Sequence, residues 1–162
     1  MDNRTGKAEY YLGIADAVLA RSTCMRRKYG AIIVRSDEII STGYNGAPRG
    51  RLNCSDAGYC AREDLGIPSG ERYELCRSVH AEANAIISAA RRDMLGATLY
   101  LVGRDAKTGA LLTDTMPCSM CKRLIINAGI TQVVVSTGEG RYETIHVRDW
   151  VFNDDSVRRA EK

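Results

Sequence analysis

Apolar residues recur along the chain with two spacings, one helical and one alternating. Residues 7–21 carry theirs three or four positions apart, which predicts an amphipathic helix with its apolar face on Tyr11, Leu12, Ala15, Val18 and Leu19. Residues 30–35 and 38–43 are two short apolar runs joined by Ser36 and Asp37, the pattern of a β-hairpin. Residues 97–102 and 132–137 predict two further strands.

Two more helices are predicted in the second half of the chain. Ser78 is placed to cap a helix over residues 79–92, whose apolar positions are Ala83, Ile86, Ile87 and Ala90. Pro117 and Gly129 mark the two ends of a helix over residues 118–128. The order helix, two antiparallel strands, helix, strand, helix, strand predicts an α/β sheet with helices packed on it, antiparallel first and parallel after the crossovers.

The remaining segments have no regular pattern. Residues 43–50 are rich in glycine, proline and asparagine and are predicted to form a loop. Residues 51–77 are irregular, and a stretch of this length is unusual in a compact domain unless something such as a metal holds it. Residues 103–116 form a long connection with a turn at 107–109, and the polar tail from Asn153 is expected to fray.

Length and composition indicate one globular domain over residues 1–162, with its core over about residues 7–150. Hydrophobic residues make up 44% of the 162 residues and charged residues 27%, as in water-soluble domains. A net charge of +3 does not indicate a nucleic-acid surface, and no nucleic-acid partner is expected. The N-terminus lacks the apolar core of a signal peptide, and no apolar run reaches the ~20 residues of a membrane span, so we expect a cytoplasmic protein without a membrane partner.

Six cysteines in such a chain need an explanation, because disulfides are disfavoured in the cytosol and metal binding or catalysis is the usual alternative. Two of them, Cys118 and Cys121, stand three apart on a predicted helix and therefore share one face. Together with His80 they form a candidate Zn²⁺ site, since two thiolates and one imidazole leave the fourth tetrahedral position for water. Both segments begin predicted helices, where the helix dipole favours thiolate.

Glu82 follows His80 by two residues, so it lies near the metal without having to bind it. A carboxylate there can take a proton from the activated water and return it to a ring nitrogen, and H-x-E with P-C-x-x-C is the signature of zinc deaminases. Taken singly, each half has a plainer interpretation. A C-x-x-C pair also occurs in structural zinc sites and redox pairs, a histidine at a helix start is commonly structural, and a glutamate there often serves only the helix dipole.

With these motifs the sequence resembles the cytidine/deoxycytidylate deaminases, including late-competence-operon homologues, from about residue 22 to residue 135. The shared segments are GAIIV at 30–34, ISTGYNGAPRG at 40–50, NC at 53–54, VHAEANAI at 79–86, PCSMC at 117–121 and IINAGI at 125–130. HAE and PCxxC specify only the broad zinc-deaminase superfamily. The GYNGxPRG loop followed by NC is narrower and is typical of members that act on dCMP.

The resemblance implies a three-layer α/β/α fold with a central mixed five-stranded sheet. It implies zinc-dependent conversion of dCMP to dUMP with release of ammonia, which supplies thymidylate synthesis. It also implies a homo-oligomer, often a hexamer, with dCTP as activator and dTTP as inhibitor. The connection over residues 103–116 is longer than in many members, and this part of the family fold helps to shape the base pocket.

Individual roles also follow from the resemblance. His80, Cys118 and Cys121 match the zinc ligands, and Glu82 matches the proton shuttle. The substrate-binding positions are Asn45 for the sugar, the backbone N–H of Ala81 for the pyrimidine carbonyl, and Arg26, Arg27 and Lys28 as candidates for the phosphate. The alternative for the three basic residues is a solvated surface. Tyr44, Gly46 and Arg49 match the effector-nucleotide site, for which the alternative is a plain turn.

The other four cysteines are explained by buried thiols, a redox set or a second, structural zinc. Cys24 and Cys54 match positions that bind a structural zinc in some members of the family, and Cys60 and Cys76 would complete a Cys₄ site that holds residues 51–77. The spacing contains no tight C-x₂-C pair, and His146 is a further candidate ligand whose alternative is a surface residue.

Two other functions stay open at this point. One is a different deaminase of the superfamily, acting on cytidine, tRNA adenosine, guanine or a riboflavin-pathway compound; the modest net charge and the 43–50 loop argue against the tRNA enzyme. The other is a non-catalytic nucleotide-binding module held together by zinc, against which the intact Glu82 argues, because a binding module has no need of a proton shuttle.

Overall fold

The computed structural model describes residues 3–154 and 156. Five strands form one sheet in the order β2-β1-β3-β4-β5. Their bounds are β1 Arg27–Arg35, β2 Glu38–Tyr44, β3 Thr98–Asp105, β4 Gln132–Gly138 and β5 Arg141–His146. The larger helices are α1 Lys7–Leu19, α4 Ala81–Ile87, α6 Ser119–Ala128 and α7 Val147–Phe152. Short turns of helix complete the chain at α2 Cys54–Ala57, α3 Ala61–Asp64, η1 Tyr73–Leu75 and α5 Arg91–Met94.

The sheet is mixed, as expected. β1 pairs antiparallel with both β2 and β3, β3 pairs parallel with β4, and β4 pairs antiparallel with β5. The β1–β2 link is tight because Ser36 and Asp37 both take positive φ angles of 51° and 63°, the conformation of a two-residue hairpin turn. The parallel pair is reached through α6, which crosses over between β3 and β4.

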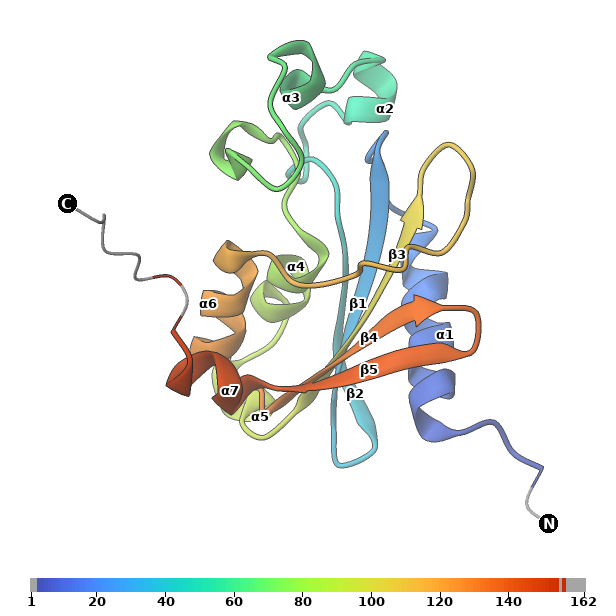
Figure 1. Cartoon of the computed structure of the whole chain (residues 1–162), viewed down its shortest axis with the longest axis vertical. Coiled ribbons are helices and arrows are strands. Elements are labelled where there is room, and N and C mark those ends of the chain that lie inside the picture. Colours follow the sequence, from blue (N-terminus) through green and yellow to red (C-terminus); the bar gives the residue numbers. More distant parts are fainter. Residues whose placement is uncertain (1–2, 155, 157–162) are drawn as a thin grey trace.

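Helices cover both faces of the sheet, which gives three layers (Figure 1). Alternation along β1 shows how the sequence builds them. Ile32 and Val34 face α1 and pack with its apolar side, whereas Ala31 and Ile33 face the opposite layer of α4 and α6. Each face thus has its own buried cluster, and the prediction of a three-layer α/β/α fold with a five-stranded mixed sheet is confirmed.

The helix predicted over residues 79–92 is shorter than expected and starts later. Ser78 does not cap it; His80 is the N-cap, and the helix stops at Ile87 before the separate turn α5. The apolar side is formed by small residues, with Ala81 and Ala85 fully buried, whereas Ile87 is 70% exposed. The reason is that β2 approaches the helix backbone so closely that only small side chains fit between them.

Sequence patterns alone missed β5 and α7. All but one of the β5 residues are exposed, so this edge strand lacks the apolar alternation that marks a strand in sequence. Residues 51–77, expected to be irregular, contain three single turns of helix. The predicted fraying of the tail from Asn153 concerns mainly residues outside those described.

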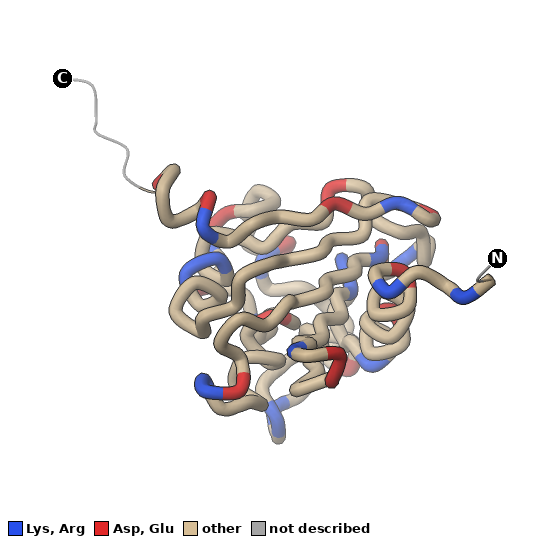
Figure 2. Tube along the Cα trace, turned by 90° about the horizontal axis from the view of Figure 1, so that it is seen from below, with Lys and Arg blue, Asp and Glu red and all other residues tan. Residues whose placement is uncertain are grey.

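Charged residues of both signs are interspersed along the chain trace (Figure 2). Within the described residues, no helix is both long enough and apolar enough to cross a membrane.

Candidate metal centre

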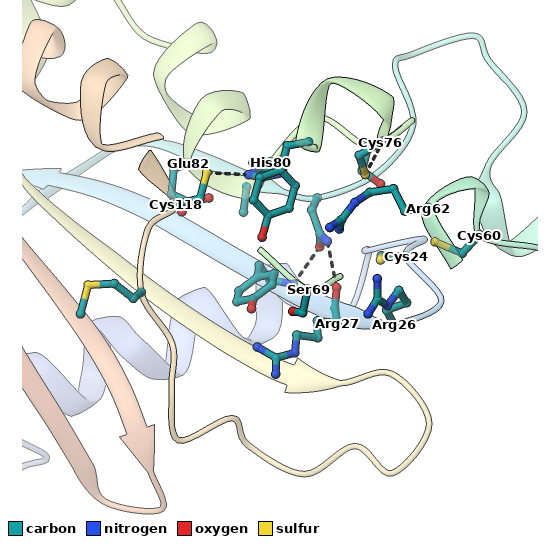
Figure 3. Close-up of a pocket in the computed structure, with 16 residues that line it drawn as sticks. Cys24, Arg26, Arg27, Cys60, Arg62, Ser69, Cys76, His80, Glu82 and Cys118 are labelled. Atoms are coloured by element: carbon teal, nitrogen blue, oxygen red, sulfur yellow. Dashed lines mark hydrogen bonds between the residues drawn. The ribbon is translucent and has the colours of Figure 1, made fainter. Parts of the chain in front are cut away.

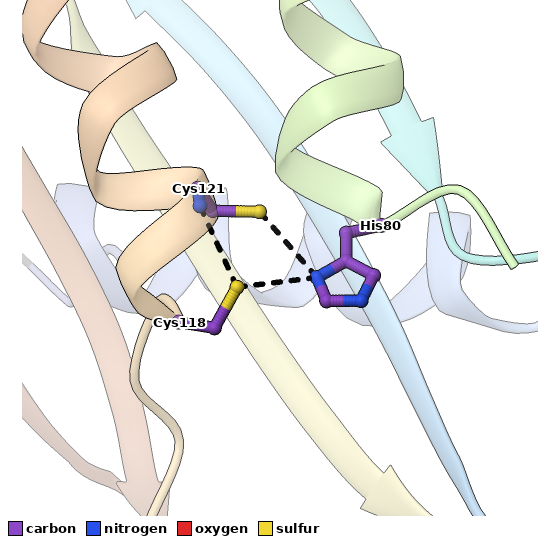
Figure 4. A group of neighbouring side chains, drawn as sticks. All are labelled: His80, Cys118 and Cys121. Carbon is purple, nitrogen blue, oxygen red and sulfur yellow. Dashed lines mark hydrogen bonds between the residues drawn. The ribbon is translucent and has the colours of Figure 1, made fainter. Parts of the chain in front are cut away.

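His80, Cys118 and Cys121 meet where α4 and α6 begin. His80 is the N-cap of α4, Cys118 is the N-cap of α6, and Cys121 lies in the first turn of α6. The Nδ1 atom of His80 is 3.5 Å from the Sγ atom of each cysteine, and one ligand atom from each residue lies within 4.8 Å of the others (Figure 4). His80 is thus brought together with two cysteines that follow it in the chain by 38 and 41 positions.

Local sequence explains this arrangement. Cys118 accepts a hydrogen bond from the backbone N–H of Cys121 at 3.5 Å, which satisfies one of the free donors at the start of α6. At its other end α6 stops at Gly129, whose φ of 79° suits glycine. On the α4 side, Ser41 of β2 donates its hydroxyl to the carbonyl of Ala85 at 2.7 Å and so fixes the helix against the sheet.

The two thiols and the imidazole shift one another's pKa values. Hydrogen bonding from the Cys121 thiol, and then from His80, lowers the pKa of Cys118 to about 4 against an opposing effect of burial. The pKa of Cys121 is raised, first by its bond to Cys118 and then by burial. Burial lowers the pKa of His80, but its bond to Cys118 and the charge of Glu82 outweigh that and raise it. One thiolate is thus stabilised before any cation binds, which suits a cation ligand set.

The donor set fits zinc. Two sulfur atoms and one imidazole nitrogen are the ligand types that Zn²⁺ prefers, and three protein ligands leave a position for water or substrate. His80 and Cys118 both line a pocket, so that position is reachable from outside. Among the described residues, this is the one group of three metal-binding side chains with ligand spacing.

Glu82 lies in the first turn of α4, lines the same pocket, and is only 5% exposed. Burial raises the pKa of its carboxyl, partly opposed by backbone hydrogen bonding and by His80. A carboxyl with a raised pKa beside a cation site holds an accepted proton more firmly than an ordinary glutamate does and can return it to a bound ligand.

The pocket extends from the metal group toward β1 and residues 60–78 (Figure 3). It contains most of the predicted substrate-binding positions, namely Arg26, Arg27, Asn45 and Ala81. Met116, at the end of the long 103–116 connection, also lines it. Lys28 does not, because its neighbours on the strand, Arg27 and Tyr29, take the pocket side and the residue between them points away.

Asn45 is 6% exposed and is held by three hydrogen bonds. Its Oδ1 accepts from the Ser22 hydroxyl at 2.6 Å and from the Tyr29 N–H at 2.8 Å, and its Nδ2 donates to the Arg27 carbonyl at 2.9 Å. One Nδ2–H bond remains for a ligand. The residue is therefore fixed in orientation and joins the 43–50 loop to the start of β1.

The residues predicted for the effector site are not among those lining the pocket. Tyr44 ends β2, and its carbonyl accepts from the Asn84 side chain at 2.8 Å. Gly46 pairs with Val79 through two backbone hydrogen bonds of 3.2 Å and 2.8 Å, and Arg49 is exposed. The 43–50 loop thus holds the segment just before His80 in place through hydrogen bonds.

The other four cysteines are near one another but not within ligand spacing of a shared ion. Cys24, Cys60 and Cys76 line the pocket, and burial raises the pKa of Cys54, opposed by Arg77 and reinforced by the other three thiols. All six cysteines are unpaired. His146 is exposed at the start of α7 and belongs to no metal group among the described residues.

Arg62 and Tyr73 are among the pocket residues that sequence reasoning missed. The Tyr73 ring packs edge-on against the His80 ring at 4.8 Å between centroids, and the Arg62 guanidinium lies 4.6 Å from the centre of the Tyr73 ring. Nothing in the local sequence distinguishes Arg62 from the other arginines of this stretch, because its burial arises from the folding of residues 60–76 around it.

Comparison with known proteins agrees with this geometry. Residues 5–137 match the family model of the cytidine and deoxycytidylate deaminase zinc-binding region. The deoxycytidylate deaminase of Mycobacterium phage D29 is 43% identical over 131 residues, covering 78% of this chain and 91% of the phage protein. The Schizosaccharomyces pombe deoxycytidylate deaminase is 38% identical over 128 residues, covering 79% of this chain and 36% of the longer yeast protein.

A solved structure shows the same fold. The dCMP deaminase of cyanophage S-TIM5, in its apo form, superposes with a TM-score of 0.54 and 25% identity over 79% of this chain and 80% of the phage enzyme. The family match spans most of the chain and includes the segments that bring His80, Cys118 and Cys121 together. This chain therefore belongs to the cytidine and deoxycytidylate deaminase family, whose domain binds zinc.

Proposed function

We propose that this protein hydrolyses dCMP to dUMP and ammonia. The observation that carries the proposal is the His80–Cys118–Cys121 group with the buried carboxyl of Glu82 beside it in one pocket. The reaction forms a bond between water oxygen and C4 of cytosine and breaks the C4–N bond, so it needs an activated water and a group that moves protons. The near full-length match to a phage deoxycytidylate deaminase supports dCMP as the substrate.

His80, Cys118 and Cys121 would hold the zinc ion through Nδ1 and two Sγ atoms. When bound there, zinc acts as a Lewis acid that lowers the pKa of water toward ~7. Glu82 takes the proton released by the attacking water, holds it because its pKa is raised, and delivers it to the base and then to the leaving ammonia. The free N–H of Ala81, at the first turn of α4, offers a hydrogen bond to the pyrimidine carbonyl, and Asn45 offers its remaining N–H to the sugar.

The decisive experiment measures ammonia release and product identity with dCMP, CMP, dCTP, deoxycytidine and adenosine on zinc-loaded protein. We expect dCMP to be the best substrate, with dUMP as the product. Absence of turnover on every cytosine nucleotide refutes the proposal, and turnover of adenosine alone points to another branch of the superfamily.

Replacing Glu82 by Gln tests the proton-transfer role separately. Glutamine has nearly the same shape but cannot accept the proton, so kcat on dCMP should fall by about 10²–10⁴-fold while the zinc content per chain stays unchanged. Activity within a few fold of the wild type would remove Glu82 from the mechanism. Loss of zinc together with activity would instead assign it to the support of the metal site.

We further propose that Cys24, Cys54, Cys60 and Cys76 bind a second, structural zinc. Cys24, Cys60 and Cys76 line the pocket, and each of these three thiols raises the pKa of Cys54, which supports a common location. Binding would draw the thiols closer together and hold residues 51–77. Elemental analysis of the purified protein should give two zinc ions per chain, and a value of one argues against the second site.

The remaining parts of the proposal rest on the family relationship. They are a homo-oligomer, with a hexamer as the state to be tested by light scattering, regulation by dCTP and dTTP through Tyr44, Gly46 and Arg49, and a cytoplasmic location. A single functional domain over the chain fits the observation that all five strands belong to one sheet. Arg26 and Arg27 line the pocket and stay candidates for contacts to the nucleotide.

A further inference from the structure

Arg62 is a buried cation with no carboxylate partner among the described residues. The residue is 6% exposed, and yet it lines the pocket that contains the metal group. Removing a charge from water is costly unless it is paired, so buried arginines are normally found against a carboxylate or an anionic ligand. Arg62 takes part in none of the ion pairs among the described residues.

The contacts of Arg62 hold it in place without neutralising it. Its Nη2 donates to the carbonyls of Pro68 at 2.9 Å and Glu71 at 2.6 Å, and its guanidinium lies over the Tyr73 ring. Its Nε is buried and has no hydrogen-bond partner among the described residues. A guanidinium has five N–H donors, and the two contacts use only Nη2, so Nε and Nη1 have no acceptor among the described residues.

The other two arginines of the pocket differ in this respect. Arg26 pairs with Glu63 at 3.1 Å, and Arg27 pairs with Asp114 at 3.2 Å, so each already has a carboxylate neighbour. Both are also more exposed than Arg62, at 28% and 42% of their side chains. Of these three cations, Arg62 alone combines burial with an unneutralised charge.

The position of Arg62 fits the far end of a substrate whose base lies at the metal group. The Tyr73 ring contacts both the Arg62 guanidinium and the His80 ring, and Figure 3 shows Arg62 and Arg26 on the side of the pocket away from Glu82 and Cys118. We propose that Arg62 binds the 5′-phosphate of the nucleotide and is the main determinant of monophosphate over nucleoside. This inference rests on the proposed function, because it takes a cytosine nucleotide as the occupant of the pocket.

The chemistry of the group supports this ligand. A guanidinium with free N–H donors binds phosphate oxygens through charge-assisted hydrogen bonds, which are the strong ones in a pocket shielded from water. Because the backbone carbonyls of Pro68 and Glu71 and the Tyr73 ring already fix its orientation, little ordering remains to be done when the ligand arrives. A nucleoside without phosphate would leave the charge unpaired, so the site favours the nucleotide.

The test replaces Arg62 by Gln, with Arg72→Gln as the matched control. Arg72 lies in the same segment, is exposed and does not line the pocket, and among the described residues its side chain bonds only Glu74. We expect Arg62→Gln to weaken the binding of dUMP, measured by calorimetry, and kcat/KM for dCMP by at least about 30-fold each. Binding of deoxyuridine should change by less than about threefold. Arg72→Gln should leave all three values unchanged.

Each result has a defined meaning. An equal loss for dUMP and deoxyuridine, or no loss for either, overturns the proposal. A zinc content lower by one ion per chain with an unchanged dUMP preference also overturns it, and assigns Arg62 to the support of the cysteine cluster. If Arg62→Gln does not fold, Arg62→Lys keeps the charge without the fork of donors, and it should still lower dUMP binding selectively.

The two proposals can fail independently. A wild-type protein that turns over no cytosine nucleotide refutes the proposed function. The phosphate site is then still decided by binding, because a wild type that prefers dUMP to deoxyuridine and loses this preference in Arg62→Gln supports it. A wild type that binds both equally refutes it.

Discussion

Substituting Gly43 by Ala should displace α4, whose N-cap residue His80 is one of the three members of the metal group. Gly43 lies in β2 directly against α4, and a Cβ atom there would be 2.3 Å from the carbonyl oxygen of Ala81 and 2.4 Å from the amide nitrogen of Ala85. Both are backbone atoms, which cannot rotate away as a flexible side chain can. Ordinary van der Waals contact begins at 3.4 Å, so helix and strand must separate by about 1 Å.

The expected cost has two parts. Forcing an extra methyl group into a tightly packed interface destabilises a fold by about 1–3 kcal/mol, and the clash with backbone atoms places Gly43→Ala at the upper end. His80 directly precedes Ala81, so a shift of α4 moves it relative to Cys118 and Cys121 on α6. A displacement of about 1 Å in a catalytic site costs on the order of 10²-fold in rate.

The assay combines urea unfolding, zinc content and kcat/KM for dCMP on the same preparation. Gly13→Ala is the matched control, because Gly13 lies in the interior of α1 with nothing within 4 Å of an added Cβ. That variant should be stabilised by about 0.5–1 kcal/mol with unchanged kcat/KM. Stability within about 0.5 kcal/mol of the wild type and normal kcat/KM for Gly43→Ala would show that α4 is not seated on β2 as described.

Two further predictions concern other parts of the fold. Asn45→Ala removes one buried and two partly buried hydrogen bonds and takes the side-chain partner from the Tyr29 N–H and the Arg27 carbonyl, so it should lower the free energy of unfolding by about 3 kcal/mol, as measured by urea titration; a loss below about 1 kcal/mol would contradict this. The hydrogen bond from Tyr11 to Asp37 raises the pKa of Tyr11 to about 12 and lowers the pKa of Asp37. Its contribution to stability should therefore hold between about pH 4 and pH 10, decline as acid protonates Asp37 below its ordinary value of 3.8, and decline again as Tyr11 ionises between 10 and about 12. Thermal midpoints of wild type and Tyr11→Phe across this range test it, and a difference that does not vary with pH would exclude the bond as its source.

Sequence patterns predicted those elements whose burial is one-sided and regular. The first helix has a regular apolar repeat. The β1–β2 hairpin and the helix between Pro117 and Gly129 add turn or end residues whose backbone preferences mark where these elements begin and end. β5 was missed because an exposed edge strand has no apolar alternation to detect. The late start of α4 could not be predicted either, because it depends on β2 packing against the small side of the helix.

The residues of the candidate site likewise fall into those that sequence patterns could find and those that they could not. His80, Glu82, Cys118 and Cys121 could be found because metal binding requires specific residue types at fixed spacing. Arg62 and Tyr73 could not, since an arginine or tyrosine in a segment without pattern has no spacing to recognise. Their contribution exists only after residues 60–76 fold around the guanidinium, and that depends on tertiary contacts with Pro68 and Glu71.

The separation of the metal-binding residues along the chain has a consequence for folding. His80 lies 38 residues before Cys118 and 41 before Cys121, and β3 runs through the interval. An ion held by all three residues closes a loop of that size and restricts the unfolded chain as a disulfide would. By the same loop-entropy reasoning it contributes about 4 kcal/mol to the free energy of unfolding. The three ligand atoms converge only when the starts of α4 and α6 lie side by side. Metal retention at His80, Cys118 and Cys121 during refolding therefore reports that the segments before and after β3 have come together, and a chain ending before Cys118 should lose this site and its contribution to stability.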